Sequence, residues 1–259
     1  MLKISPLFSG SKGNCTLIQS DNANILLDAG FNYRAIVQAL FARGLTPTDI
    51  DAIVISHEHG DHVNALPTWS KCAHTPVYAP HLIASYLQQK MCVTDVRPIT
   101  CDFKIGDVIV ESYQCSHDAR ACYGYRFCCG AHYFACVTDT GCIGNTLIDF
   151  LAPCSAIMLE SNHDVDMLLK GEYSYPLKRR ILSDYGHLSN VQASEILSKL
   201  IGTQVKNVIL AHLSEKNNTR ELAFNNAVNM YTAQGLTEGK DIMVYIADQY
   251  KNNITICLE

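Results

Sequence analysis

The 259-residue sequence has little of what marks several other classes of protein. No apolar run approaches the ~18 residues of a membrane-spanning helix. The start MLKISPLFSG contains no signal-peptide core, so we expect a cytoplasmic protein without membrane contact. The net charge of −5 argues against a broad nucleic-acid-binding face. Repeats and linkers are absent, and 48% hydrophobic with 17% charged residues predicts one globular domain over residues 1–259.

Cysteine is abundant but lacks the spacing of a disulfide framework or a redox motif. The twelve cysteines do not recur at a fixed interval and form no C-x-x-C motif. A chain of this length does not need disulfides to be stable. Most of the cysteines lie in apolar stretches, and Cys128 and Cys129 are adjacent in a strand-like run. We therefore predict reduced, buried thiols.

Apolar periodicity predicts that short strands and helices share the chain in an α/β arrangement. The expected helices cover about Tyr33–Arg43, Val63–Lys71, His81–Gln89, a stretch starting at Ser189, and Arg220–Ala233. Strands are expected in the segments 2–8, 15–20, 24–28, 53–55, 76–79, 107–116, 123–129, 133–141, 156–161, 205–214, 242–246 and 254–258.

The segment IVISHEHGDH, residues 53–62, concentrates four possible metal ligands: His57, His59, Asp61 and His62. The apolar run before Ser56 reads as a buried strand, and side chains two apart on an extended chain point the same way. His57 and His59 therefore share one direction, and the glycine that follows lets the backbone turn toward the second pair. Imidazole and carboxylate together suit zinc, iron or manganese.

Other polar residues also stand where apolar strands end. They are His117, Asp139, Glu160 and His212. Ligands gather at strand ends in layered α/β folds because the sheet fixes their geometry. Asp28 ends another strand, where its carboxylate can orient a histidine ligand or cap the following helix.

The pattern H-x-H-x-D-H, followed by the single later residues, resembles the metallo-β-lactamase superfamily over nearly the whole chain. The resemblance implies a four-layer αββα sandwich with two divalent metals, zinc first and manganese or iron as alternatives, and a bridging hydroxide as nucleophile. One metal would be held by His57, His59 and His117. The other would be held by Asp61, His62 and His212, with Asp139 bridging.

Branches of this superfamily differ at identifiable positions. The β-lactamases often have cysteine where this chain has Asp139, and flavodiiron proteins replace the residue equivalent to His59 by glutamate, so neither activity is expected. Glyoxalase II enzymes share all seven ligands, so a thioester hydrolase is an alternative, though it should carry a separate C-terminal helical domain. The segments SGSKGN, ESNHD and GHLSN resemble the WalJ/YycJ-like branch, which is regarded as cytoplasmic bacterial nucleases.

The favoured function is therefore a metal-dependent phosphodiesterase or nuclease, similar to a DNA exonuclease, with nucleic acid as substrate. The two metals would supply the attacking hydroxide and neutralise charge on the phosphoryl oxygens. His187 or His163 would supply a proton to the leaving oxygen or clamp the phosphate. The loop 9–14 presents backbone N–H groups and a cation to a phosphate, or is an ordinary turn. The candidate catalytic residues are Asp61, Asp139, His163 and His187, and the candidate substrate contacts are Ser11, Lys12 and Asn162.

Overall fold

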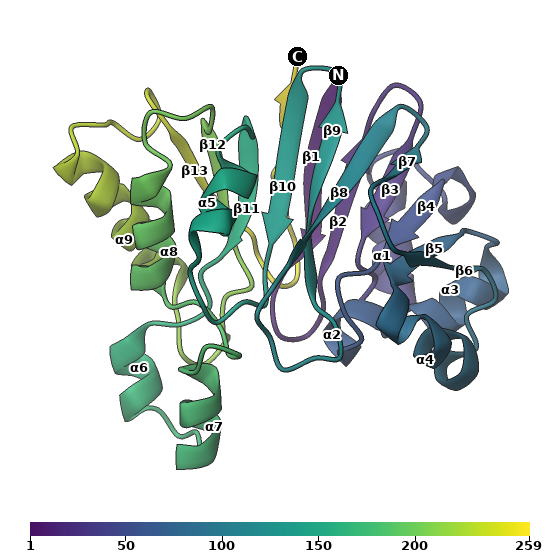
Figure 1. The fold of residues 1–259 in the computed structure, drawn as a ribbon, viewed down its shortest axis with the longest axis horizontal. Coiled ribbons are helices and arrows are strands. Elements are labelled where there is room, and N and C mark those ends of the chain that lie inside the picture. Colours follow the sequence, from purple (N-terminus) through teal and green to yellow (C-terminus); the bar gives the residue numbers. More distant parts are fainter.

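The computed structural model describes all 259 residues and contains two seven-stranded sheets that pack face to face (Figure 1). Sheet 1 has the order β14 (Ile256–Leu258), β1 (Leu2–Phe8), β2 (Cys15–Gln19), β3 (Asn24–Leu27), β4 (Ala52–Val54), β5 (Val77–Pro80) and β6 (Val96–Ile99). Sheet 2 has the order β13 (Met243–Ile246), β12 (Asn207–Ala211), β11 (Ala156–Glu160), β10 (His132–Val137), β9 (Tyr123–Cys129), β8 (Val108–Gln114) and β7 (Phe103–Ile105).

Helices cover the outer face of each sheet. Helices α1 (Tyr33–Phe41), α3 (Leu66–Cys72) and α4 (His81–Met91) pack on sheet 1. Helices α5 (Asn145–Leu151), α8 (Asn190–Lys199) and α9 (Arg220–Ala233) pack on sheet 2. The short elements α2 (Gly60–Val63), α6 (Val165–Lys170), α7 (Tyr175–Ile181) and a 3₁₀ turn, η1 (Pro47–Asp49), complete the list. The four layers confirm the predicted αββα sandwich.

Three apolar clusters follow from these layers. The central one lies between the sheets and includes Ile4, Ile25, Tyr125, Phe127 and Phe134, all fully buried. The other two lie between each sheet and its helices. Strands with both faces covered read as continuous apolar runs, which explains the pattern of the sequence.

Parallel pairing brings the ends of several strands to one edge. In sheet 1, β3, β4, β5 and β6 run parallel, and in sheet 2 β10, β11, β12 and β13 run parallel. The residues that follow β3, β4, β10, β11 and β12 therefore emerge together. This edge holds the candidate ligands predicted from the sequence.

The helix predicted over Val63–Lys71 is wrong as a single element, because the structure breaks it into α2 and α3. The Ala65 N–H donates to the Ala29 carbonyl, 2.8 Å away in the loop after β3, and not to a carbonyl one helical turn earlier. Pro67, near the start of α3, has no N–H to continue a helix from α2. Because of this break, the segment that carries the candidate histidines, residues 57–62, packs against the loop after β3.

The twelve cysteines are all unpaired, but their burial is uneven. Seven are buried, and burial raises the pKa of the Cys128 thiol to about 11 and that of Cys154 to about 12. Cys257 is exposed because it points outward between Ile256 and Leu258 on the edge strand β14. The prediction of burial is wrong for four residues: Cys72, Cys92, Cys101 and Cys257. Separately, none of the helices combines the length and apolarity needed to span a membrane.

Candidate metal centre

The first cluster at the sheet edge consists of three imidazoles, those of His57, His59 and His117. Their ligand atoms all lie within 4.8 Å of one another, and His57 Nε2 is 3.1 Å from His59 Nδ1. His57 and His59 follow β4, and His117 follows β8 of the other sheet. Burial lowers the pKa of His57, and its three histidine neighbours lower it further, so this ring is neutral. Neutral imidazoles that face one another form a suitable metal site.

The second cluster consists of Asp61, His62 and His212. Asp61 Oδ2 is 3.4 Å from His62 Nε2 and 3.4 Å from His212 Nε2. Burial alone would lower the pKa of His62, but the surrounding carboxylates outweigh it and raise that pKa. Metal binding here would therefore be coupled to release of a proton.

Asp139 lies between the two clusters. Its Oδ2 is 3.3 Å from His62 Nε2, and its Oδ1 is 3.8 Å from His117 Nε2. Oδ2 is buried and has no hydrogen-bond partner in the protein. A buried carboxylate oxygen left without a donor is costly unless a cation occupies the site. The donor set and this free oxygen fit bound metal ions.

Three ligand histidines, His57, His62 and His117, are held by a neighbouring residue through ring nitrogen Nδ1. His62 Nδ1 is 2.7 Å from Asp28 Oδ2, and His117 Nδ1 donates to the Gly186 carbonyl at 3.1 Å. His57 Nδ1 lies 3.0 Å from Ser56 Oγ, which also donates to both carboxylate oxygens of Asp28. These contacts leave the opposite nitrogen of each ring facing the site, the arrangement that metal-binding histidines require.

Glu160 had no predicted role, although its place at a strand end was visible in the sequence. Its Oε1 is 2.9 Å from His212 Nδ1 and 2.8 Å from His187 Nδ1. Its Oε2 accepts the N–H groups of Thr140 and Leu188 at 3.1 and 3.0 Å. Burial opposes its ionisation, but the two histidines outweigh burial and lower its pKa. One fully buried carboxylate thus orients two histidines of the site.

Asn14 is a second residue that the sequence analysis did not assign. Its amide Nδ2 lies 3.0 Å from His62 Nε2 and 3.4 Å from Asp61 Oδ2, and its backbone N–H donates to the Asp61 carbonyl at 2.7 Å. A Cβ on Gly30 would come within 1.6 Å of the Asp61 carbonyl oxygen, so only glycine fits there. The loops after β1, β3 and β4 are therefore locked together beside the second cluster.

His187 lies near both clusters, with its ring centroid 5.0 Å from that of His117 and 5.4 Å from that of His212. Its side chain is 17% exposed, and its Nδ1 lies 2.8 Å from Glu160 Oε1. Burial lowers the pKa of His187, but the Glu160 and Asp139 carboxylates outweigh it and raise that pKa. His187 Nε2 has no partner in the protein and can hold a proton.

The remaining predicted site residues lie in different environments. His163 is 1% exposed, neither ring nitrogen has a partner, and burial lowers its pKa to about 4. Asn162 is also buried and donates to the His212 carbonyl at 2.9 Å. Ser11 is exposed, and Lys12 is exposed but paired with Glu215, with 3.0 Å between Lys12 Nζ and Glu215 Oε2.

Three ligand or supporting residues adopt left-handed backbone conformations, which non-glycine residues rarely do. The φ angles are 60° for Asp28, 57° for Asp139 and 55° for His212. Such conformations cost on the order of 1–3 kcal/mol each. Asp28 and His212 directly follow β3 and β12, and Asp139 lies two residues after the end of β10, where the turn aims its side chain at the site.

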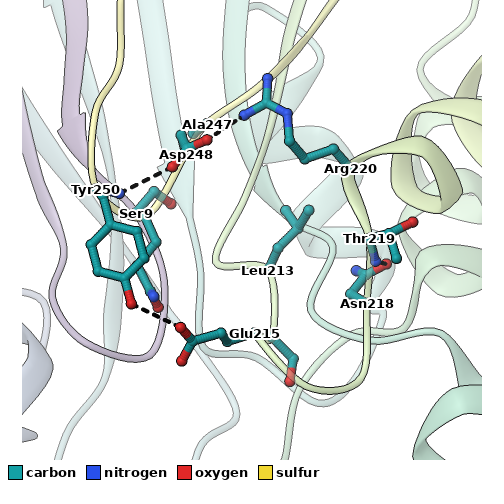
Figure 2. A pocket seen from close by; sticks show the side chains of 11 residues that line it. Ser9, Leu213, Glu215, Asn218, Thr219, Arg220, Ala247, Asp248 and Tyr250 are labelled. Carbon is teal, nitrogen blue, oxygen red and sulfur yellow. Dashed lines mark hydrogen bonds and ion pairs between the residues drawn. The ribbon is translucent and has the colours of Figure 1, made fainter.

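A hollow of about 250 Å³, shown in Figure 2, is lined by Ser9 and by Leu213, the residue after His212, among others. Ser9 on its wall accepts the His212 N–H at 2.9 Å. Arg220 pairs with Asp248 at 2.7 Å on one side, and Tyr250 donates to Glu215 at 2.8 Å on the other. Its charged side chains are thus paired within the protein.

Comparisons with known proteins agree with this geometry. Residues 23–213 match the family described as "Beta-lactamase superfamily domain". The exodeoxyribonuclease WalJ of Streptococcus pneumoniae serotype 2 (strain D39 / NCTC 7466) is 34% identical over 250 residues, which cover 94% of this chain and 93% of that protein. The exodeoxyribonuclease YycJ of Bacillus anthracis is 34% identical over 256 residues, 95% of this chain and 96% of that protein.

Solved structures show the same fold at lower identity. The metallo-beta-lactamase fold protein YhfI from Bacillus subtilis superposes with a TM-score of 0.76 at 18% identity, over 99% of both chains. The short form of human tRNase Z superposes with a TM-score of 0.67 at 16% identity, also over 99% of both chains. The chain belongs to the beta-lactamase superfamily and, within it, to the family of WalJ and YycJ. It is a metal-dependent hydrolase of that superfamily.

Proposed function

We propose that this protein is a nuclease that hydrolyses phosphodiester bonds of DNA with two bound divalent metal ions. The observation that carries the proposal is the pair of ligand clusters on either side of Asp139, with His187 beside both. Both curated relatives are named exodeoxyribonucleases, which supports DNA as the substrate class.

The seven residues would hold one ion in each cluster, with Asp139 between them. Five of the seven are histidines, which suits zinc best and leaves manganese or iron as alternatives. The ions would supply Lewis acidity and activate water near neutral pH. Asp61 and Asp139 are the carboxylates of this set, and we count both as catalytic.

His187 would supply what a phosphodiester needs beyond the metals. The departing alkoxide is a strong base, so it requires a proton or a fixed positive charge nearby. Glu160 Oε1 lies 2.8 Å from His187 Nδ1 and raises the pKa of the ring, which favours the form that carries a proton on Nε2. General acid catalysis of this kind contributes about 10²–10⁴-fold to the rate.

The other predicted site residues are less directly placed to contact a substrate. Lys12 would have to exchange Glu215 for a substrate phosphate, whereas Ser11 is exposed beside it and free to donate. Asn162 and His163 are buried, so we infer that they act through the loops they support. Asn162 holds the His212 carbonyl, and the His163 carbonyl accepts the N–H of Asn190 at the start of α8.

The thioester hydrolase alternative has less support. It predicts a separate C-terminal helical domain for the substrate. Here α9 and β13 belong to the sheet 2 layers, and β14 pairs with β1 in sheet 1. The elements α9, β13 and β14 therefore belong to the sandwich itself.

The decisive assay uses end-labelled single- and double-stranded DNA and RNA with Mn²⁺, Zn²⁺ or chelator. We expect stepwise shortening of DNA that chelator abolishes, and up to two ions per chain by metal analysis. Thioester hydrolysis far faster than cleavage of any nucleic acid would contradict the proposal, as would a single ion held by four protein ligands. The cytoplasmic location predicted from the sequence remains a prediction for cell fractionation.

A further inference from the structure

A large hollow of about 800 Å³ opens beside Asp61, on the side of the second cluster. We name it the Asn64 pocket. Its walls come from the loops after β1 and β3, the start of helix α1, and helices α2 and α3. The residues that matter for its chemistry are Ser11, Phe31, Tyr33, Asp61, Asn64 and Thr68. Because Asp61 lines the pocket and also belongs to the second cluster, the pocket adjoins the metal centre.

The pocket is polar, and its two charged side chains, Asp61 and Lys12, both have partners of opposite charge within the protein. Its only basic side chain is Lys12, which Glu215 neutralises at 3.0 Å. The side chains of Ser11, Asn64 and Thr68 are exposed and make no hydrogen bond within the protein. Phosphate sites are usually built from unpaired cations, so this lining does not select phosphate. It offers amide and hydroxyl groups to a neutral polar ligand.

Two aromatic rings add flat apolar surface, and packing holds both in place. Phe31 stacks on Phe8 with ring centroids 4.3 Å apart. Tyr33 contacts Trp69 edge to face, with centroids 5.6 Å apart. Fixed aromatic rings beside free amides and hydroxyls suit a base and its sugar, because bases stack on aromatic side chains. Amides also read the hydrogen-bonding edges of bases.

The opposite side of the metal centre is different. The hollow beside His117 has about 310 Å³, and it is lined by Arg120 and Tyr185 among others. The Arg120 side chain is 62% exposed, and its Nε lies 3.9 Å from Glu58 Oε1, so the guanidinium is only loosely paired and faces solvent. A DNA strand whose phosphate lies at the metals would meet an arginine on that side and neutral groups on the other. The two sides therefore suit different parts of a nucleotide chain.

We propose that the Asn64 pocket binds the nucleoside next to the scissile phosphodiester, with Asn64 and Thr68 as its polar contacts and Tyr33 and Phe31 as its flat wall. The proposal rests on the proposed nuclease function and names the subsite that positions the substrate. Asn14 and Gly30 both contact the backbone carbonyl of Asp61, which fixes the pocket wall relative to the second cluster. A nucleoside bound in the pocket would therefore be held at a defined position relative to the metal centre.

The test compares three activated esters that leave the same p-nitrophenolate: thymidine 5′-(p-nitrophenyl phosphate), its 3′ isomer, and bis(p-nitrophenyl) phosphate. We expect the metal-loaded protein to prefer at least one thymidine ester, and that isomer identifies which side of the phosphate the pocket serves. In the double variant Asn64→Ala/Thr68→Ala, the ratio of kcat/KM for that ester to kcat/KM for bis(p-nitrophenyl) phosphate should fall about tenfold.

The matched control is Asn229→Ala/Thr232→Ala, an exposed amide and hydroxyl on α9 at the outer face of sheet 2. Its ratio should equal that of the unaltered protein. An unchanged ratio in the pocket variant, or no preference for either thymidine ester in the unaltered protein, would overturn the proposal.

A second measurement separates the pocket from the nuclease function. Saturation-transfer NMR of free thymidine with the metal-free protein should detect binding that the pocket variant loses and the control keeps. If no phosphodiester is hydrolysed but this binding is seen, the nuclease proposal fails and the nucleoside pocket stands. If DNA is hydrolysed and thymidine binds both variants equally, the pocket assignment fails alone.

Discussion

The two halves of the molecule supply the metal centre in different ways. Sheet 1 contributes four candidate ligands from one loop, residues 57–62, directly after β4. Sheet 2 contributes His117, Asp139 and His212 from the ends of three different strands. A loop that carries several ligands leaves a motif in the sequence, whereas single ligands at separate strand ends become a site only through strand pairing.

The two halves also support their ligands differently. On the sheet 1 side, Asp28 and Ser56 hold His62 and His57, and Asn14 contacts Asp61. On the sheet 2 side, Glu160 alone holds both His187 and His212. Support is thus distributed in one half and concentrated in the other. Metal binding and activity should therefore be more sensitive to substitution of the supporting residue on the sheet 2 side, Glu160, than to substitution of any one supporting residue on the sheet 1 side.

The largest effect is expected at Asp139, the residue between the two clusters. Asp139→Ala should weaken both metals together and bring hydrolysis below detection, because the carboxylate lies within reach of histidines from both halves. Metal content per chain and the DNA assay measure this, with the exposed Asp149→Ala on α5 as the matched control. Loss of one metal with activity retained would make Asp139 a ligand of one half only.

The next effect is expected at His187. His187→Ala should keep both metals yet lose at least about 10²-fold in kcat on DNA, since general acid catalysis is typically worth 10²–10⁴-fold. The loss on bis(p-nitrophenyl) phosphate should be much smaller because that leaving group needs no proton. Steady-state kinetics with both substrates is the measurement. Equal losses on both would assign His187 to phosphate binding, and no loss on either would contradict its role.

Substitutions of Glu160 and Asp28 test whether the histidines of sheet 2 depend on one supporting carboxylate more than those of sheet 1 do. Supporting partners of metal ligands typically contribute 10–100-fold to metal affinity or activity. Glu160→Gln should lower metal affinity by roughly that amount and also reduce kcat through His187, whereas Asp28→Asn should act on metal affinity alone. Competition with a zinc chelator, together with kcat at saturating metal, separates the two. An equal loss of kcat in both variants would mean that support is not concentrated at Glu160.

The smallest effect concerns stability and pH. The pKa of His163 is about 4 in the folded protein and about 6.5 when unfolded, so the unfolded chain binds the extra proton between these values. Stability should therefore fall as pH is lowered from about 6.5 toward 4, with His163 accounting for about 2 kcal/mol at pH 5.

His163→Leu removes this titration. Urea unfolding of the metal-free proteins at pH 7.5 and pH 5 should show that the variant loses about 2 kcal/mol less than the unaltered protein. The exposed His74→Leu is the control, and it should follow the unaltered protein. Parallel losses in His163→Leu and the unaltered protein would show that His163 is not buried as a neutral ring.

The histidine loop was predictable because its ligands are adjacent in the sequence, and the αββα fold was predicted from the family resemblance that this motif and the later single residues carry. The predicted bounds of α9 agree with the structure, and α8 begins directly after its N-cap Ser189, where a helix was predicted to start. The break between α2 and α3 was not predictable, because it depends on the distant Ala29 carbonyl. Likewise, the outward position of Cys257 follows from the pairing of β14 with β1.

By itself, the sequence determined which residue types stand at the strand ends, and hence the family and the candidate ligands. The tertiary structure alone decided that Glu160 serves two histidines, that Asn14 contacts Asp61 and His62, and that His163 is buried without partners. Each of these contacts joins segments far apart in the chain. A contact of this kind depends on strand order and loop docking, which local composition does not encode.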